Sequence, residues 1–104
     1  MAFRQDDLIL AARFKALAHP ARLAIVRTLL RAGCDGCCCG DVVRELPLAQ
    51  STVSQHLRIL RDVGLIHGES EGPRCSYRVD IDALASVQAA VGALHAPGAV
   101  SRAK

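Results

Sequence analysis

Aromatic side chains are scarce in this chain of 104 residues, which has no tryptophan, two phenylalanines and one tyrosine. Modules that bind RNA or single-stranded DNA stack bases on aromatic rings, so this scarcity argues against both kinds of module. The chain also lacks an apolar run of membrane-spanning length, and its first residues lack the pattern of a signal peptide. We therefore expect a cytoplasmic protein that does not contact a membrane and whose thiols stay reduced.

Catalytic patterns are missing as well. The four histidines are scattered, no nucleophile stands at a useful spacing from a base, and there is no glycine-rich phosphate loop. We therefore do not expect an enzyme. Hydrophobic residues make up 51% of the chain, which is ample for one small domain over residues 1–97, followed by a flexible tail over 98–104. The net charge of +3 permits a polyanionic partner.

The most informative stretch is residues 51–62, which the periodicity predicts to be a helix. Val53, Leu57 and Leu60 recur at helical spacing and would form one buried stripe. The other side carries Ser, Thr, Gln and Arg rather than the Glu and Lys of an ordinary solvated face. Such side chains suit the base edges and phosphates of a DNA major groove. The candidate DNA-binding residues are Ser51, Thr52, Ser54, Gln55 and Arg58.

The flanking segments complete a helix-turn-helix. Asp41 to Leu46 is expected to be a short helix, with Pro47 to Ala49 as the turn, and Gly64 is expected to end the recognition helix. Two extended runs, 65–70 and 75–80, surround a Gly-Pro turn and predict a β-hairpin. A hairpin directly after a recognition helix is a wing, and Arg74 at its tip is either a DNA contact or an exposed loop charge.

Three further helices are expected. They span residues 6–17, 20–32 and 82–95. In the second, Leu23, Val26 and Leu30 would form the buried stripe, widened by Ile25 and Leu29. Its solvated side would carry three arginines, Arg22, Arg27 and Arg31.

The last helix carries apolar residues at the spacing of a coiled-coil seam: Leu84, Val87, Val91 and Leu94. Within one chain only the first helix is an obvious partner for this seam. The fold class we expect is mainly α with a small β-hairpin, a winged helix-turn-helix that forms a homodimer through its first and last helices. The alternative is that the seam packs inside a monomer.

Four of the five cysteines lie within six positions: Cys34, Cys37, Cys38 and Cys39. In a reducing compartment this density indicates metal binding or redox sensing rather than a disulfide framework. The segment precedes the helix expected at Asp41, and a helix N-terminus stabilises the thiolate that binds soft metal ions. Neighbouring side chains cannot all point inward, so Cys37 with Cys39, plus Cys34 or Cys38, is the expected three-sulfur set.

The order of elements and three motifs resemble the ArsR/SmtB family of metal-responsive winged-helix repressors. The motifs are residues 16–23 (ALAHPARL), 51–57 (STVSQHL) and 60–66 (LRDVGLI). The resemblance covers residues 8–95. It implies a homodimer that binds a double-stranded DNA operator without any cofactor and leaves it when an inducer binds.

The resemblance also implies where the inducer binds. In the family, cysteines at the start of the helix after this segment bind arsenite, or cadmium and lead. This chain departs from the arsenite pattern Cys-x-Cys-Asp because Gly40 separates Cys39 from Asp41, whereas the zinc pattern Cys-x-Gly-Asp matches Cys38. The family's second metal site, on the last helix, is expected to be absent because Asp80-Ile81-Asp82 lacks the required histidine and Ala93 stands at a ligand position. As(III) or Sb(III) is the first choice of inducer, with Cd, Pb or Zn as alternatives.

Two other interpretations stay open. Cys34 and Cys37 have the spacing of a redox dithiol, although the βαβ context of redox enzymes is missing, so a redox-responsive repressor is one alternative. A zinc-stabilised interaction module is the other, and such a module would unfold on chelation. Cys75 is expected to be a small residue on the wing, or a remote thiol ligand across a dimer.

Overall fold

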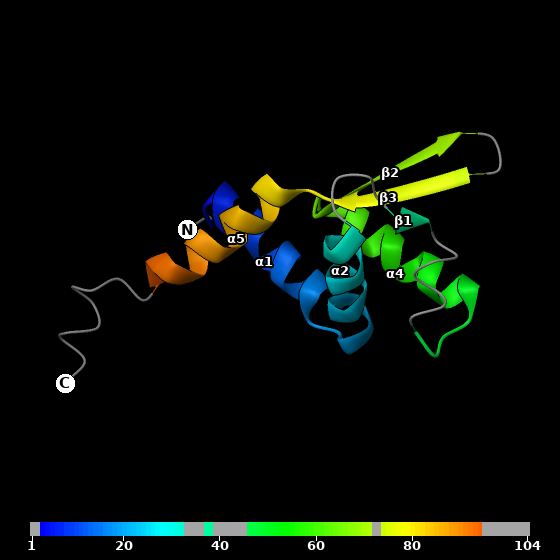
Figure 1. Cartoon of the computed structure of the whole chain (residues 1–104). Coiled ribbons are helices and arrows are strands. Elements are labelled where there is room, and N and C mark those ends of the chain that lie inside the picture. The colour runs from blue at the N-terminus through cyan, green and yellow to red at the C-terminus, as the bar shows by residue number, and fades with distance from the viewer. Residues whose placement is uncertain (1–2, 33–36, 39–45, 72–73, 95–104) are drawn as a thin grey trace.

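The computed structural model describes residues 3–32, 37–38, 46–71 and 74–94, and these form the winged helix-turn-helix expected from the sequence (Figure 1). The elements are α1 (Gln5–Leu17), α2 (Pro20–Ala32), β1 (Cys37–Cys38), α4 (Gln50–Asp62), β2 (Ile66–Glu71), β3 (Arg74–Val79) and α5 (Ile81–Leu94). The short helix expected at 41–46 falls outside the described residues, apart from Leu46, and so does the tail over 98–104. None of the described helices is long and apolar enough to cross a lipid bilayer.

The core forms where α4 meets α1, α2 and the base of the hairpin. The predicted stripe of α4 is fully buried, as are the two residues that follow its last turn, Leu65 and Ile66. Fully burying one such side chain stabilises the fold by about 1.5–3 kcal/mol. Leu10, Phe14 and Leu17 of α1 are partly buried against the same core.

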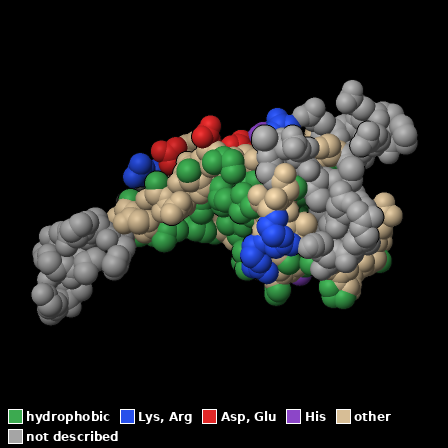
Figure 2. Space-filling model, viewed as in Figure 1, with side chains coloured by type: hydrophobic (Ala, Val, Ile, Leu, Met, Phe, Trp, Pro, Cys, Tyr) green, Lys and Arg blue, Asp and Glu red, His purple; other side chains and the backbone are tan. Residues whose placement is uncertain are grey.

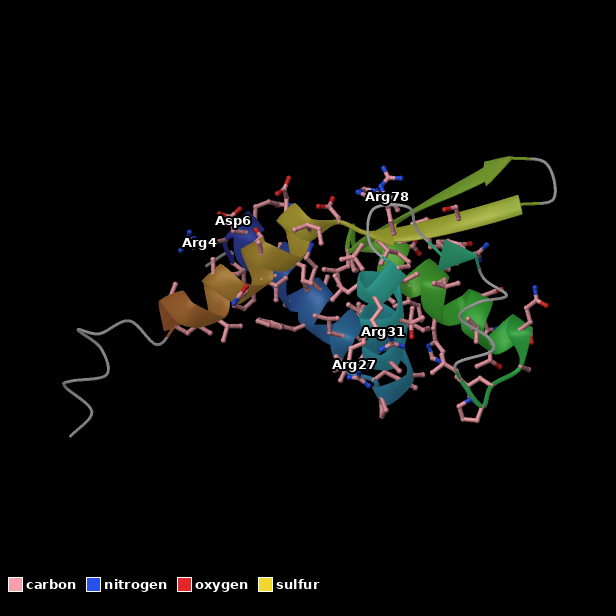
Figure 3. All side chains as sticks on the ribbon, in the orientation of Figure 1. Arg4, Asp6, Arg27, Arg31 and Arg78 are labelled. Atoms are coloured by element: carbon pink, nitrogen blue, oxygen red, sulfur yellow. The ribbon has the colours of Figure 1, made fainter. Side chains whose placement is uncertain are left out.

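The expected stripe of α2 was wrong in part. Leu23 and Leu30 are 43% and 41% exposed, whereas the supposed margin, Ile25 and Leu29, is fully buried beside Val26. Apolar residues occupy most of this helix's circumference, so periodicity alone does not select the inner face. That choice comes from β3 and α4, which both pack against α2. Lys and Arg side chains gather over α2 on the face shown in Figure 2, where Figure 3 labels Arg27 and Arg31.

The wing contains a third strand that the sequence did not predict. All strand pairs are antiparallel, in the order β1-β3-β2. In the hairpin, Ile66 pairs with Val79 and Glu71 with Arg74, so the predicted hairpin is confirmed to within one residue at each end. In β1, Cys37 pairs with Tyr77 and Cys38 with Ser76. A strand of two residues is too short to show the alternation of apolar and polar side chains that predicts a strand. The pairing of β1 also depends on β3, which lies about 40 positions later in the sequence.

Helix α5 lies against α1 at the end of the molecule away from the wing (Figure 1). Only the first half of its predicted seam is covered within the chain: Val87 is buried and Leu84 half-buried, whereas Val91 and Leu94 are 46% and 75% exposed. The two helices border a groove of about 600 Å³. Its lining is mixed, with apolar residues such as Ile9 and Leu10 beside charged ones such as Asp6 and Arg13.

The recognition helix ends where the sequence predicted. Gly64 adopts a φ of +77°, and the amide of Leu65 donates to the carbonyl of Leu60 at 3.1 Å, which closes the last turn. A Cβ on Gly64 would lie 3.2 Å from a guanidinium nitrogen of Arg13, whose Nε already donates to the Val63 carbonyl.

We expect Gly64→Ala to lower the free energy of unfolding by about 1–2 kcal/mol, because an L-residue is strained at positive φ and Arg13 has to shift. Gly92→Ala is the control, since its added Cβ meets nothing within 4 Å and alanine favours a helix. Urea unfolding at one protein concentration measures both. An equal change in the two variants would contradict this account of the turn.

Candidate nucleic-acid interface

Packing of α4 turns its polar side outward. Because Val53, Leu57 and Leu60 face the core, residues half a turn away have to face solvent. Four of the five candidate DNA-binding residues on this helix are exposed, namely Ser51, Ser54, Gln55 and Arg58, whereas Thr52 is half-buried at the flank. Ser51, Gln55 and Arg58 are three and four residues apart and therefore lie in one row along the helix.

The start of α4 is electrostatically suited to an anion. Ala49 provides no side-chain cap, and the first turn contains no acidic residue. The positive end of the helix dipole therefore has no carboxylate from this turn to neutralise it, which favours a phosphate nearby.

The hairpin brings Arg74 to the outer end of the wing. It is the first residue of β3, and its backbone pairs with that of Glu71, so it directly follows residues 72–73 that join the strands. The side chain of Arg74 lies outside what the structure describes, and its role as a DNA contact stays a prediction.

A polar cluster that the sequence analysis missed joins α4 to the other helices. Arg22 was expected on the solvated side of α2, which was wrong, because this residue is half-buried. Its Nε donates to Nδ1 of His56 at 3.2 Å, and its Nη1 donates to the carbonyls of Lys15 and Ala16 at 3.3 and 3.1 Å. One guanidinium thus binds the last turn of α1 and the middle of α4. The signal available in the sequence was that His56 stands three residues after Val53 and four before Leu60, at the edge of the buried stripe.

His19 completes this cluster. Its Nδ1 accepts a hydrogen bond from the amide of Ala21 at 3.0 Å, at the start of α2. Its ring centroid lies 4.5 Å from that of His56, with the rings tilted by 49°. Burial lowers the pKa of His56 below the ordinary value of 6.5, and the neighbouring charges of His19 and Arg22 lower it further.

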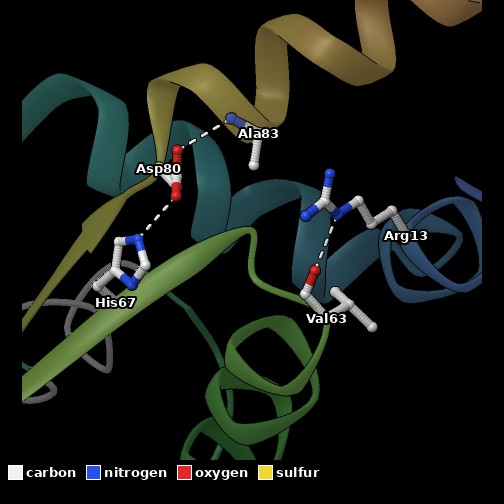
Figure 4. Close-up of polar contacts among 5 residues, drawn as sticks. All are labelled: Arg13, Val63, His67, Asp80 and Ala83. Carbon is white, nitrogen blue, oxygen red and sulfur yellow. Dashed lines mark hydrogen bonds and ion pairs between the residues drawn. The ribbon is translucent and has the colours of Figure 1, made fainter. Parts of the chain in front are cut away.

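The wing base and the start of α5 share a second polar contact (Figure 4). Asp80 accepts a hydrogen bond from the amide of Ala83 at 2.9 Å, which caps α5, and its other oxygen lies 2.7 Å from Nε2 of His67 in β2. The hydrogen bond from Ala83 lowers the pKa of Asp80 below its ordinary range, and the contact with His67 lowers it further. Figure 4 also shows Arg13 donating to the Val63 carbonyl, which ties α1 to the end of α4.

The cysteine-rich segment is only partly described. Cys37 and Cys38 form β1, beside β3, whereas Cys34 and Cys39 lie outside the described residues. Cys75 belongs to β3 and directly precedes Ser76, the backbone partner of Cys38. Among the side chains that the structure does describe, no group of three or more His, Cys, Asp and Glu could hold a metal ion.

Comparison with known proteins is consistent with this geometry. A family model described as a helix-turn-helix domain matches residues 17–69. The transcriptional regulator YgaV of Escherichia coli is 34% identical over 84% of this chain and 86% of its own length. The transcriptional repressor SmtB of Mycobacterium tuberculosis is 40% identical over 62% of this chain, which spans only 46% of that protein. A crystal structure of an ArsR family transcriptional regulator, RHA00566, has a TM-score of 0.77 over 91% of this chain and 93% of its own at 22% identity, which shows the shared fold.

Proposed function

Because the chain belongs to the ArsR/SmtB family of helix-turn-helix transcriptional regulators, we propose that it is a homodimeric repressor whose operator is released when a thiophilic ion binds the cysteine-rich segment. The observation that carries the DNA-binding part is the outward polar row of α4. Gln55 and Arg58 are its base-reading residues, since amide and guanidinium groups form paired hydrogen bonds with adenine and guanine. Ser51, Thr52 and Ser54 bind the adjoining phosphates, and Arg74 binds the backbone from the wing.

The homodimer forms through α1 and α5. Both helices leave large apolar side chains exposed in the single chain, including Leu8, Ile9, Val91 and Leu94. Large apolar side chains exposed on two adjacent helices are typical of an interface rather than of a solvated surface. Two copies of a reading helix would then match an operator with two half-sites.

The inducer is a soft ion bound by thiolates, with As(III) or Sb(III) preferred over Cd, Pb or Zn. Four cysteines within six positions supply more sulfur than a trigonal site needs. Cys37 and Cys39, with Cys34 or Cys38, form the site. Neighbouring strands lie about 4.8 Å apart, so the pairing of Cys38 with Ser76 also keeps the backbone of Cys75 close to the segment.

Release follows from the position of this segment in the chain. It separates α2 from α4, and β1 within it pairs with the middle strand of the wing. Bringing three sulfurs around one ion therefore displaces both α4 and the wing, the two elements that contact DNA in this proposal. A coupling free energy of about 1–3 kcal/mol lowers operator affinity by one to two orders of magnitude.

Oxidation is a second candidate signal, favoured by the dithiol spacing of Cys34 and Cys37. A disulfide within one chain would constrain the same segment without any metal. Mass spectrometry after peroxide treatment in the absence of metal distinguishes the two signals.

Gln55→Ala and Arg58→Ala are expected to lose about 1–3 kcal/mol of affinity for a duplex selected from a randomised library, with little change for an unrelated duplex. Arg27→Ala is the matched control for Arg58→Ala, because it removes the same charge from an exposed position on α2. Gel shift measures the affinities. Equal losses on both duplexes in the α4 variants would mean that these residues do not read sequence.

Val91→Glu is expected to raise the dimer dissociation constant at least about tenfold, since a charge in an apolar interface is costly. Ala89→Glu places the same charge on an exposed position of α5 that lies about half a turn from the seam and should leave the dimer intact. Sedimentation equilibrium measures both variants. A Val91→Glu protein as dimeric as the wild type would place the interface elsewhere.

Cys37→Ser and Cys39→Ser are expected to bind the selected duplex as the wild type does but to resist release by arsenite, because each loses a ligand sulfur. Antimonite, cadmium, zinc and peroxide are titrated side by side on the same labelled complexes, and Cys75→Ser tests the fifth thiol. If arsenite still releases both of the first two variants at the wild-type concentration, the inducer site is not in this segment.

A further inference from the structure

A side-chain hydrogen bond joins Arg22 of α2 to His56 in the middle of the recognition helix. The same guanidinium is held by two backbone carbonyls of the last turn of α1, so its position is fixed from a second side. His56 is half-buried and directly follows Gln55 on α4. A movement of His56 relative to Arg22 therefore moves the polar row that faces outward.

We propose that Arg22 and His56 hold α4 in its DNA-binding orientation and that protonation of His56 in mildly acidic solution releases this hold and weakens operator binding. The proposal rests on the DNA-binding function of α4 proposed above. Both are positioning residues, since each acts through the placement of Gln55 and Arg58 rather than through contact with a base.

The hydrogen bond sets the protonation state that the fold requires. Because Nε of Arg22 donates to Nδ1 of His56, that nitrogen carries a lone pair and the neutral ring carries its proton on Nε2. Protonation of Nδ1 turns the acceptor into a donor and sets two cationic groups against each other. The interaction then changes from an attractive contact to a repulsive one.

The charged groups nearest to His56 come from the elements packed against α4. The α1–α2 corner contributes His19 and α2 contributes Arg22, and both disfavour a charged His56. From α1, Lys15 contributes its backbone carbonyl to Arg22, and Arg13 binds the far end of α4 at Val63. The described titratable side chain of β2, His67, contacts Asp80 instead.

The direction of the pH effect follows from these neighbours. The pKa of His56 is lower in the folded protein than the ordinary value of 6.5, so the unfolded or released state takes up the proton first. The stabilising contribution of the contact is complete above pH 6.5 and is lost as the pH falls through the folded-state pKa. Simple electrostatics predicts the opposite trend, because histidines that become cationic on acidification attract DNA.

The experiment measures affinity for the selected duplex and for an unrelated duplex between pH 7.5 and 5.5 at constant salt. We expect the wild-type affinity for the selected duplex to fall about two- to fivefold while that for the unrelated duplex stays level or rises. His56→Asn keeps an oxygen acceptor for Arg22 but does not titrate. The affinity of this variant should match that of the wild type at pH 7.5 and should not decrease on acidification. His67→Asn is the same substitution at an exposed histidine, and the affinity of this variant should decrease on acidification as that of the wild type does.

Two results would overturn the proposal: a wild-type affinity that stays level or rises on acidification, or a His56→Asn variant that keeps the wild-type fall. Circular dichroism at both pH values shows whether each variant is folded.

Titration of the histidine ring protons by NMR reports on the contact in the absence of DNA. There the pKa of His56 should lie below 6.5 and should rise in Arg22→Gln, and an unchanged pKa in that variant also overturns the proposal. A protein that binds no duplex at any pH, with this NMR result intact, would instead contradict the proposed DNA-binding function.

Discussion

Burial of one apolar stripe on α4 determines which side chains of that helix reach the surface. Val53, Leu57 and Leu60 are almost completely excluded from solvent, and each such burial is worth about 1.5–3 kcal/mol. Exposed serine, glutamine and arginine side chains contribute little to stability, so packing rather than polar chemistry sets the rotation of the helix. The position of Gln55 and Arg58 on the outer face is therefore a consequence of the core. A substitution that alters the stripe also alters the surface presented to DNA.

Packing sets the rotation of α4 about its axis, and two arginines restrict its remaining movement. Arg13 binds the carbonyl of Val63 at the end of the helix, and Arg22 binds His56 near its middle. Hydrogen bonds of this kind contribute only about 1 kcal/mol each to stability. Their directionality matters more, because two separated contacts fix the tilt of α4 against α1 and α2. At Val63 the acceptor is a backbone carbonyl, which does not titrate, whereas at His56 the acceptor is an imidazole nitrogen, which does. Only the second one makes the tilt of α4 dependent on pH.

Much of the fold could be predicted because it depends on local periodicity. The stripe of α4, the turn at Gly64 and the hairpin all follow from residues close together in sequence. The errors concern choices that distant residues make. Leu23 and Ile25 were equally suitable for burial until α4 and β3 selected one side of α2. Arg22 was assigned to solvent because nothing in its own helix shows the carbonyls of α1 that it binds. The residues that face outward on α4 were predictable. The contacts of Arg13 and Arg22 that orient this helix were not.

Strand β3 connects the parts of the molecule that the proposed mechanism requires to move together. It lies between β1, which carries two of the clustered cysteines, and β2, which directly follows the recognition helix. At its end Asp80 caps α5 and contacts His67 of β2, so the wing base is also tied to the helix proposed to form the dimer. The proposed inducer, by displacing β1, would therefore act on a strand whose two ends lead to the proposed DNA surface and to the proposed dimer interface. In β3, Ser76 and Tyr77 are paired with β1 on one side and with β2 on the other, so these two positions connect the segment to the rest of the wing. An ion bound at the proposed cysteine site would therefore reach α4 through β3 and β2.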